Sequence, residues 1–261
     1  AFLLGSLAVD VEKRGRTVGA KFDVKVAMQV QLEINRFCAN TQLNYFLRTM
    51  PLAVTSAACA RHDELILLAW ADVVGVKAAT MGERERAERQ ARLPVRLGGL
   101  GLTSQTAIAR AARVGSWALC WRPMQTLCPR EFGDVEISSA WGVPSFEELR
   151  DAHAELRAVH RDVEATYAGW RSVYYDFDKA GEGHLHFHPA RLPARHQLLP
   201  ISDFGSTSDY LKNAQRTWSS IIHHSEWVGL FRSLLAVSSR EAVRFIAVSQ
   251  PQAGAWLNAV P

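Results

Sequence analysis

The sequence contains few cysteines, no long apolar run and no alternating pattern typical of strands. Its four cysteines, Cys38, Cys59, Cys120 and Cys128, lie scattered among apolar residues, and no two of them form a CxxC pair. A chain of 261 residues with so little cysteine needs no disulfides and suits a reducing compartment. We therefore expect an intracellular protein of the nucleus or cytoplasm, not a secreted one. No apolar run reaches the roughly 18–20 residues of a membrane span, so no membrane partner is expected.

What is present is an ordinary globular composition with a mildly basic charge balance. Hydrophobic residues make up 48% of the chain and charged residues 21%, which suffices for a sizeable core. The net charge of +4 and the pI near 9.0 allow a nucleic-acid partner without requiring one. The sequence begins without methionine, and we expect it to be a fragment of a longer chain.

Apolar residues recur at helical spacing through the first third of the chain. The pattern predicts one helix over 24–48, ended by Pro51, and a second over 55–78. The second is apolar nearly all round and should therefore be buried. A short charged helix over 82–92 follows and is ended by Pro94.

The next predicted helix is rich in alanine and glycine. It runs from a capping hydroxyl at Thr103 or Ser104 to about Trp121. Small side chains let neighbouring helices approach closely, so we expect this helix in the core.

The second half contains the clearest helical pattern. A capping box at Ser145–Glu148 opens a run in which Leu149, Leu156 and Val163 recur every seven residues. This spacing predicts one long helix over about 145–176 with a single apolar seam. A coiled-coil dimer through the seam is an alternative, but several seam residues fit a regular zipper poorly. We favour packing against the chain's own helices.

The remainder of the chain also predicts helices and no sheet. Residues 179–206 resemble a loop, a helix follows over about 208–235, and a second capping box at Ser238–Glu241 opens the last helix. The predicted fold class is all-α: a multi-helix, bundle-like array with one long heptad-patterned helix and no substantial sheet.

Three short segments carry a family resemblance. They are NYFLRTMP at 44–51, LPVRLGGLGLTS at 93–104 and AGAWLNAVP at 253–261. In this order they resemble the region that follows the polymerase core in retrotransposon reverse-transcriptase-like proteins, of the non-LTR-like type found in algae and other protists. The resemblance runs from about residue 40 to the end and is weakest between 130 and 195.

The resemblance implies a division of the chain and a parent activity. It implies the tail of an upstream module over 1–22, a helical thumb-like region over 23–130 and a helical connector over 145–261. For the parent protein it implies RNA-directed DNA synthesis, and the rest of that polyprotein would be a partner of this chain.

The residues that such a polymerase needs for catalysis are missing. Reverse transcriptases hold two divalent metals with adjacent aspartates, and this sequence has no Asp-Asp pair. The nearest approach, Tyr175-Asp176-Phe177-Asp178, separates its acids by one residue at the end of a predicted helix. We therefore expect no enzymatic activity from this chain, no cofactor and no small-molecule ligand.

A histidine cluster is the weak candidate for a metal site. In an extended segment His184, His186 and His188 would point the same way and could converge on one ion. Only Asp178 and Glu182 lie near enough in sequence to add ligands, and the flanking glycines and proline fit a loop equally well. We expect no bound metal.

The glycines of the second family-like segment match no phosphate-binding pattern. Gly98, Gly99 and Gly101 fit neither GxGxxG nor a Gly-Lys-Ser/Thr loop. We expect them to allow a sharp reversal between Pro94 and the next helix.

Five arginines fall within thirteen residues of the charged helix and its C-terminal flank, interleaved with three glutamates. Glu–Arg pairing on a solvated helix face is the simpler interpretation. The alternative is that Arg89, Arg92 and Arg96, beyond the last glutamate, contact phosphates, with Arg191 and Arg195 as a second, weaker patch.

The function predicted from these observations is that of a non-catalytic thumb and connector fragment. It would contact the backbone of an RNA or DNA template–primer duplex without reading its sequence. The alternative is an all-helical protein-interaction scaffold without a nucleic-acid role, acting through the long helix.

Overall fold

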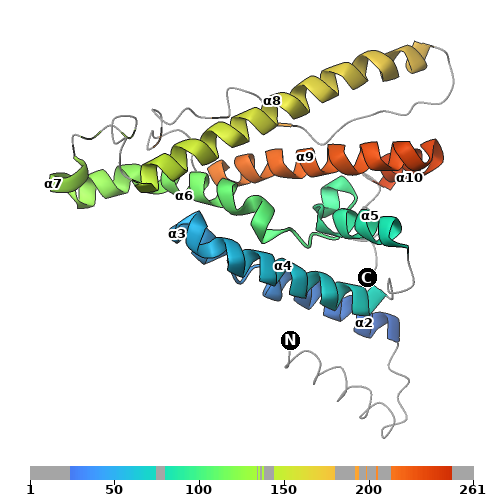
Figure 1. Cartoon of the computed structure of the whole chain (residues 1–261), viewed down its shortest axis with the longest axis horizontal. Coiled ribbons are helices and arrows are strands. Elements are labelled where there is room, and N and C mark those ends of the chain that lie inside the picture. Colours follow the sequence, from blue (N-terminus) through green and yellow to red (C-terminus); the bar gives the residue numbers. More distant parts are fainter. Residues whose placement is uncertain are drawn as a thin grey trace, which may run out of the picture.

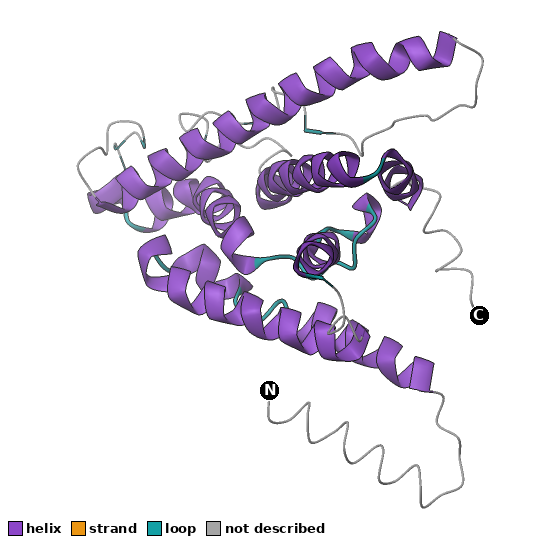
Figure 2. Cartoon of the chain, turned by 45° about the vertical axis from the view of Figure 1, so that its right-hand side comes forward, coloured by secondary structure: helices purple, strands orange, loops and turns teal. Residues whose placement is uncertain are grey.

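The computed structural model describes four long stretches of the chain and a few single positions, namely 24–74, 80–133, 135, 137, 144–179, 192–193, 198, 204 and 213–248. Helices account for most of these residues, and no strand occurs within the described ranges (Figure 2). The prediction of an all-α, multi-helix fold is confirmed.

The long helices are arranged in three tiers (Figure 1). Helix α8 (Pro144–Lys179) forms one side, α6 (Gln105–Leu127) and α9 (Ala214–Val237) lie in the middle, and α4 (Leu52–Val74) with α2 (Val24–Ile34) forms the other side. Helix α6 contacts helices in both outer tiers as well as α9. It is therefore the central element of the fold.

Shorter elements fill the spaces between the tiers. Helix α3 (Asn44–Thr49) packs on α6, and α5 (Met81–Arg92) packs on α9. Helix α7 (Pro129–Phe132) follows α6, α10 (Ser239–Val248) folds back on α9, and a 3-10 turn (Val95–Leu97) continues α5.

Small side chains place α6 close to α9, as the sequence predicts. Ala111, Ala112 and Ala118 are fully buried. A Cβ added at Gly115 would lie 2.6 Å from the Cα of Gln215 on α9. A larger residue there would force the two backbones apart, so the glycine permits the close approach.

The N-terminus of α6 is capped by its own N-cap residue, Ser104, and by Asp63 of α4. The Ser104 hydroxyl accepts a hydrogen bond from the Ala107 amide at 3.1 Å and donates one to Asp63 at 2.6 Å. The Asp63 carboxylate also accepts from the amides of Gln105 and Thr106, at 2.7 and 3.1 Å. Asp63 thus satisfies two backbone donors that the helix itself leaves free.

The apolar seam of α8 packs within the chain, as we favoured over a dimer. Leu149 and Leu156 are buried in a core shared with α6 and α9, and Val163 is buried against Trp227 and Phe231 of α9. The helix covers the predicted range of 145–176 and extends a few residues at its C-terminal end.

Glu148, which the sequence places in a capping box at the start of α8, contacts other helices in the structure. The helix begins at Pro144, so Ser145 lies inside its first turn. The Glu148 carboxylate instead accepts from the amide of Leu52, at the start of α4, at 2.9 Å, and lies 3.4 Å from the guanidinium of Arg113. Glu148 thus ties α8 to α4 and α6. The side chain of Ser145 lies outside the described residues.

The single helix predicted over 24–48 is interrupted in the structure. A π-helical turn at Asn35–Ala39 ends α2, and α3 starts only at Asn44. At the break the carbonyl of Asn40 accepts from the Gln105 side chain at 2.7 Å. This contact from α6, 65 positions away, satisfies a carbonyl that a continuous helix would have used itself.

The expectation that the second helix is buried all round was wrong. Helix α4 starts at Leu52 rather than 55 and is described as far as Val74, so residues 75–78 of the prediction lie outside the described residues. Ile66, Leu67 and Trp70 are buried as expected. However, Leu65 and Leu68 are 38% and 44% exposed.

The glycine run reverses the chain as predicted. Gly98 and Gly101 adopt φ values of 79° and 78°, which glycine reaches without strain. The reversed chain is fastened to the end of α5: the amide of Gly101 donates to the Leu93 carbonyl at 2.8 Å and that of Leu102 to the Ala91 carbonyl at 3.1 Å. The family-like segment at 93–104 is thus a structural turn.

The two regions implied by the resemblance share their core. Leu93 and Leu97 from the first region are buried beside Val163 and Trp227 from the second, and α6 is the most extensive partner of α9. The division into thumb-like and connector regions stays a prediction. None of the helices in the described ranges is long and apolar enough to span a membrane.

Candidate nucleic-acid interface

Helix α5 carries two of the predicted phosphate contacts, Arg89 and Arg92. A capping box that the sequence analysis missed opens it: Thr80 accepts from the Glu83 amide at 3.4 Å, and Glu83 accepts from the Thr80 amide at 3.0 Å. The hydroxyl and amide of Thr80 lower the pKa of the Glu83 carboxyl by bonding to its charged form. The Thr-x-x-Glu spacing was a sufficient sequence signal for this helix start.

The first turns of α5 show the Glu–Arg pairing of the simpler interpretation. Arg84 donates to Glu88 at 2.9 Å, and Arg89 donates to Glu85 at 2.8 Å. Arg89 also lies close to α9, with a guanidinium nitrogen 3.9 Å from the position that a Cβ on Gly229 would take. Its charge is therefore partly neutralised within the chain.

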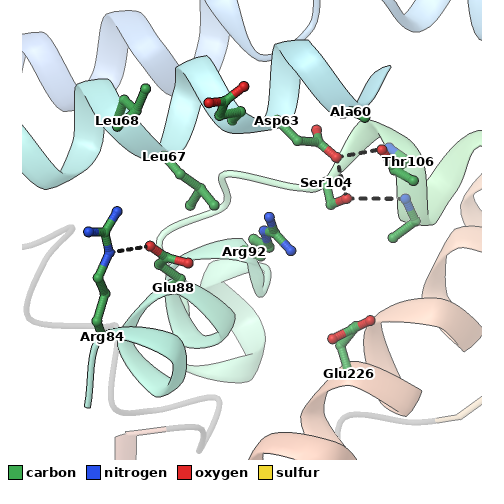
Figure 3. A pocket seen from close by; sticks show the side chains of 12 residues that line it. Ala60, Asp63, Leu67, Leu68, Arg84, Glu88, Arg92, Ser104, Thr106 and Glu226 are labelled. Atoms are coloured by element: carbon green, nitrogen blue, oxygen red, sulfur yellow. Dashed lines mark hydrogen bonds and ion pairs between the residues drawn. The ribbon is translucent and has the colours of Figure 1, made fainter. Parts of the chain in front are cut away.

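Arg92 lines a pocket between α4, α5, the start of α6 and α9 (Figure 3). The pocket has a volume of about 610 Å³, and four carboxylates line it, from Asp63, Glu64, Glu88 and Glu226. Arg84 is the second arginine of the lining, so acids outnumber bases there. This balance disfavours entry of a phosphate into the pocket.

Arg96 lies beyond the pocket and contacts α9 directly. Its guanidinium donates to the Ser220 hydroxyl at 2.9 Å. Burial lowers the pKa of Arg96, and the positive charge of Arg216 on α9 lowers it further. Within the described residues neither arginine forms an ion pair. Two neighbouring cations without an acid between them are unusual, because each disfavours the other.

His223 lies on the same side of α9. Both of its ring nitrogens are buried and have no hydrogen-bond partner among the described residues. Burial, and then the charge of Arg96, lower its pKa to about 4. His223 is therefore neutral at physiological pH.

The α9 part of this surface was missed by the sequence analysis. Arg216, Ser220 and His223 stand at positions i, i+4 and i+7 of one helix and so share a face. That spacing was visible in the sequence, but nothing in the sequence showed that the face lies against Arg96.

The three predicted arginines of the α5 segment meet α9 in antiparallel order. Arg96 contacts Ser220, Arg92 lines the same pocket as Glu226, and Arg89 approaches Gly229. The structure thus brings the three to one junction, but only Arg96 meets a second cation there.

The remaining predicted site residues lie outside the described residues or in a helix. Arg191, Arg195, His184, His186 and His188 are not among the described positions. Asp176 and Asp178 fall in the last turns of α8. In the described part of the chain no group of three His, Cys, Asp or Glu side chains could hold a metal ion.

A buried Tyr–His pair is part of the core rather than of a site. The hydroxyl of Tyr167 on α8 lies 2.8 Å from Nδ1 of His224 on α9. Tyr167 is 5% exposed and His224 is fully buried, and burial strongly raises the pKa of Tyr167. With both groups out of reach of a substrate, their hydrogen bond holds α8 to α9.

Comparisons of this chain with protein families, with curated proteins and with solved structures find no match.

Proposed function

We propose that this chain is a non-catalytic, helical thumb and connector part of a reverse-transcriptase-like retrotransposon protein, and that it contacts the sugar–phosphate backbone of a template–primer duplex. The motif resemblance at 44–51, 93–104 and 253–261 supports the family. The rest of the parent polyprotein would supply the paired metal-binding acids that this sequence lacks.

The observation that carries the proposal is the uneven distribution of charge. Residues 80–127, which form α5, the glycine turn and α6, contain eight arginines, no lysine, three glutamates and no aspartate, a net of 8 − 3 = +5. The whole chain has a net charge of +4. The positive excess therefore resides entirely in residues 80–127, where Arg110 and Arg113 are paired with Glu155 and Glu148 of α8. The other arginines of this stretch supply the positive charge expected of a surface that neutralises phosphates.

The first test is binding of a 20-base-pair RNA–DNA hybrid over a series of salt concentrations, measured by fluorescence anisotropy. We expect a Kd in the micromolar range at low salt and a steep loss of affinity as salt rises, since each neutralised phosphate releases condensed counterions. Replacing Arg89, Arg92 and Arg96 by alanine should flatten the log–log slope by about one unit, because Arg89 is already paired with Glu85 and Arg92 lines an acid-rich pocket.

A matched control separates site-specific contacts from general charge. Arg130, Arg157 and Arg240 are also exposed, and replacing these three by alanine removes the same total charge. Equal slopes for the two triple variants would argue against a contact through the α5 segment. No binding by the wild-type chain at low salt would refute the proposed function.

The second candidate function, an interaction scaffold, is favoured by a different observation. Apolar side chains are exposed along α2, the π-helical turn, α3 and the start of α4: Phe37 is 61% exposed, Tyr45 70%, Phe46 50% and Val54 60%. Contiguous exposed apolar surface marks interaction sites. A scaffold predicts weak or no duplex binding, and a salt dependence that the arginine substitutions leave unchanged.

A further inference from the structure

We propose that Arg96, Arg216 and Ser220 form a binding site for a single phosphodiester group of a nucleic-acid backbone, at the junction of the 3-10 turn with α9. This site rests on the proposed function and deepens it. It adds two α9 residues and identifies which of the α5-segment arginines meets the backbone.

The first step is the geometry of the junction. Arg96 comes from the turn after α5, while Arg216 and Ser220 lie one helical turn apart on α9. The 2.9 Å hydrogen bond from Arg96 to Ser220 fixes the guanidinium against α9 on the face that carries Arg216. Both arginines are exposed, so a ligand can reach them from solvent.

The second step is the charge balance. Arg96 and Arg216 are close enough to repel each other, and in the described part of the chain no carboxylate pairs with either. Arg84, Arg89 and Arg113 each have a glutamate partner. A bound anion would replace the missing counter-charge, and two guanidinium groups present planar donor pairs that match the oxygens of a phosphate.

The third step is the unpartnered histidine beside the pair. The two buried nitrogens of His223 form no hydrogen bond among the described residues, and His223 lies near enough to Arg96 to be affected by its charge. Buried polar atoms in native proteins nearly always have a partner. The ring nitrogens of His223 therefore mark a polar position beside Arg96 that lacks a hydrogen-bond partner among the described residues.

The class of ligand follows from the exposure of Arg96 and Arg216 to solvent. An open pair of arginines holds a single free phosphate weakly. It becomes effective when neighbouring phosphates of one strand bind to further basic residues at the same time. A backbone phosphodiester fits this arrangement better than a small phosphorylated metabolite, which needs an enclosing pocket.

The direct test observes the arginine Nε–H signals by NMR while inorganic phosphate is added to the chain at constant ionic strength in chloride. Signals are assigned by their loss in Arg96→Lys and Arg216→Lys. We expect the Arg96 and Arg216 signals to shift with a millimolar Kd, and those of Arg130 and Arg240 to stay in place. No shift at the pair, or equal shifts at all four arginines, would overturn the site.

The duplex assay then separates failure of the site from failure of the function. Relative to wild type, R96Q/R216Q should flatten the log–log salt slope by about one unit, the value for one phosphate contact. R130Q/R240Q removes the same charge and should change the slope by clearly less. Thermal melts followed by circular dichroism check that both variants fold.

The outcomes have distinct meanings. Duplex binding that R96Q/R216Q weakens no more than R130Q/R240Q overturns the site and leaves the proposed function standing. No duplex binding by the wild-type chain overturns both the proposed function and the phosphodiester assignment. The R96K/R216K variant keeps the charge but loses the paired donors, so we expect it to retain the slope and to bind with lower affinity.

Discussion

Two parts of the molecule differ in how far their apolar side chains are buried. Helices α6, α8, α9 and α10 bury theirs in aromatic-rich cores that include Trp218, Trp227 and Phe231. Helices α2, α3 and α4, with the turns between them, carry ten of the fifteen large apolar side chains that are exposed among the described residues.

The difference bears on where a partner would bind. The seam of α8 is the more regular apolar pattern in the sequence, yet α6 and α9 cover it. The less regular patterns of α2 to α4 are the ones left exposed. A regular apolar seam therefore does not by itself identify an interaction surface, because the chain's own helices compete for it.

The largest expected effect contrasts a buried aromatic with an exposed one. Phe231 is fully buried and stacks on Trp227 with ring centroids 5.3 Å apart, whereas Tyr45 is 70% exposed. We expect Phe231→Ala to lower the free energy of unfolding by about 4 kcal/mol, through lost burial and the cavity left behind. Tyr45→Ala should change it by less than about 0.5 kcal/mol. Urea denaturation followed by circular dichroism measures both, and similar losses would show that α3 is covered in solution.

A second contrast tests the link between the two parts. Glu148 is 20% exposed and holds Arg113, which is 7% exposed, and the amide of Leu52, whereas the Arg110–Glu155 pair lies at the surface with about half of each side chain exposed. Glu148→Ala leaves a buried guanidinium and a helix-end amide unpaired, so we expect a loss of about 3 kcal/mol. Glu155→Ala should cost less than about 1 kcal/mol. Equal effects in urea denaturation would mean that water replaces Glu148 at little cost.

Two helical glycines predict effects of opposite sign. A Cβ at Gly115 would meet the backbone of Gln215, whereas one at Gly169 on α8 would meet nothing within 4 Å. We expect Gly115→Ala to destabilise the fold by about 2 kcal/mol, because α6 and α9 must move apart. Gly169→Ala should stabilise it by up to about 1 kcal/mol through helix propensity. A stabilising Gly115→Ala, seen as a higher Tm, would contradict the close approach of the two helices.

The smallest expected effect is a pH dependence of stability from His223. Its pKa falls from an ordinary value of 6.5 to about 4 in the folded chain. Between these values the unfolded chain binds the extra proton, so stability should fall as the pH drops from about 6.5 towards 4. From pH 7 to pH 5 we expect a loss of about 1–2 kcal/mol that His223→Gln removes. The same pH slope in wild type and H223Q would assign the acid sensitivity to other groups.

Much of the local structure followed from the sequence. Prolines at 51 and 94 end helices, the heptad spacing of Leu149, Leu156 and Val163 produces α8, and the glycines at 98 and 101 take up positive φ. These features depend on neighbours within a few residues of each other, so sequence spacing was enough to predict them. The small residues of α6 likewise predicted a helix packed closely in the core.

The candidate site was predictable only in part. Arg96 was named from its sequence position, but its partners Arg216 and Ser220 lie 120 and 124 residues further along the chain. The sequence spacing also treated Arg89, Arg92 and Arg96 alike. One pairs with Glu85, one lines an acid-rich pocket and one meets a second cation.

By itself, the sequence determined that this chain is helical, where several of its helices begin, and that it lacks the paired acids of a polymerase. Only the tertiary structure decided that Glu148 bonds to the start of α4, that the contact from Gln105 lies at the break between α2 and α3, and that Arg96 bonds to Ser220 of α9. The physical reason is the sequence distance over which each kind of interaction acts. Backbone preferences and helical periodicity act over a few residues, whereas a carboxylate or guanidinium bonds to whichever group packing brings within about 3 Å, however distant in sequence.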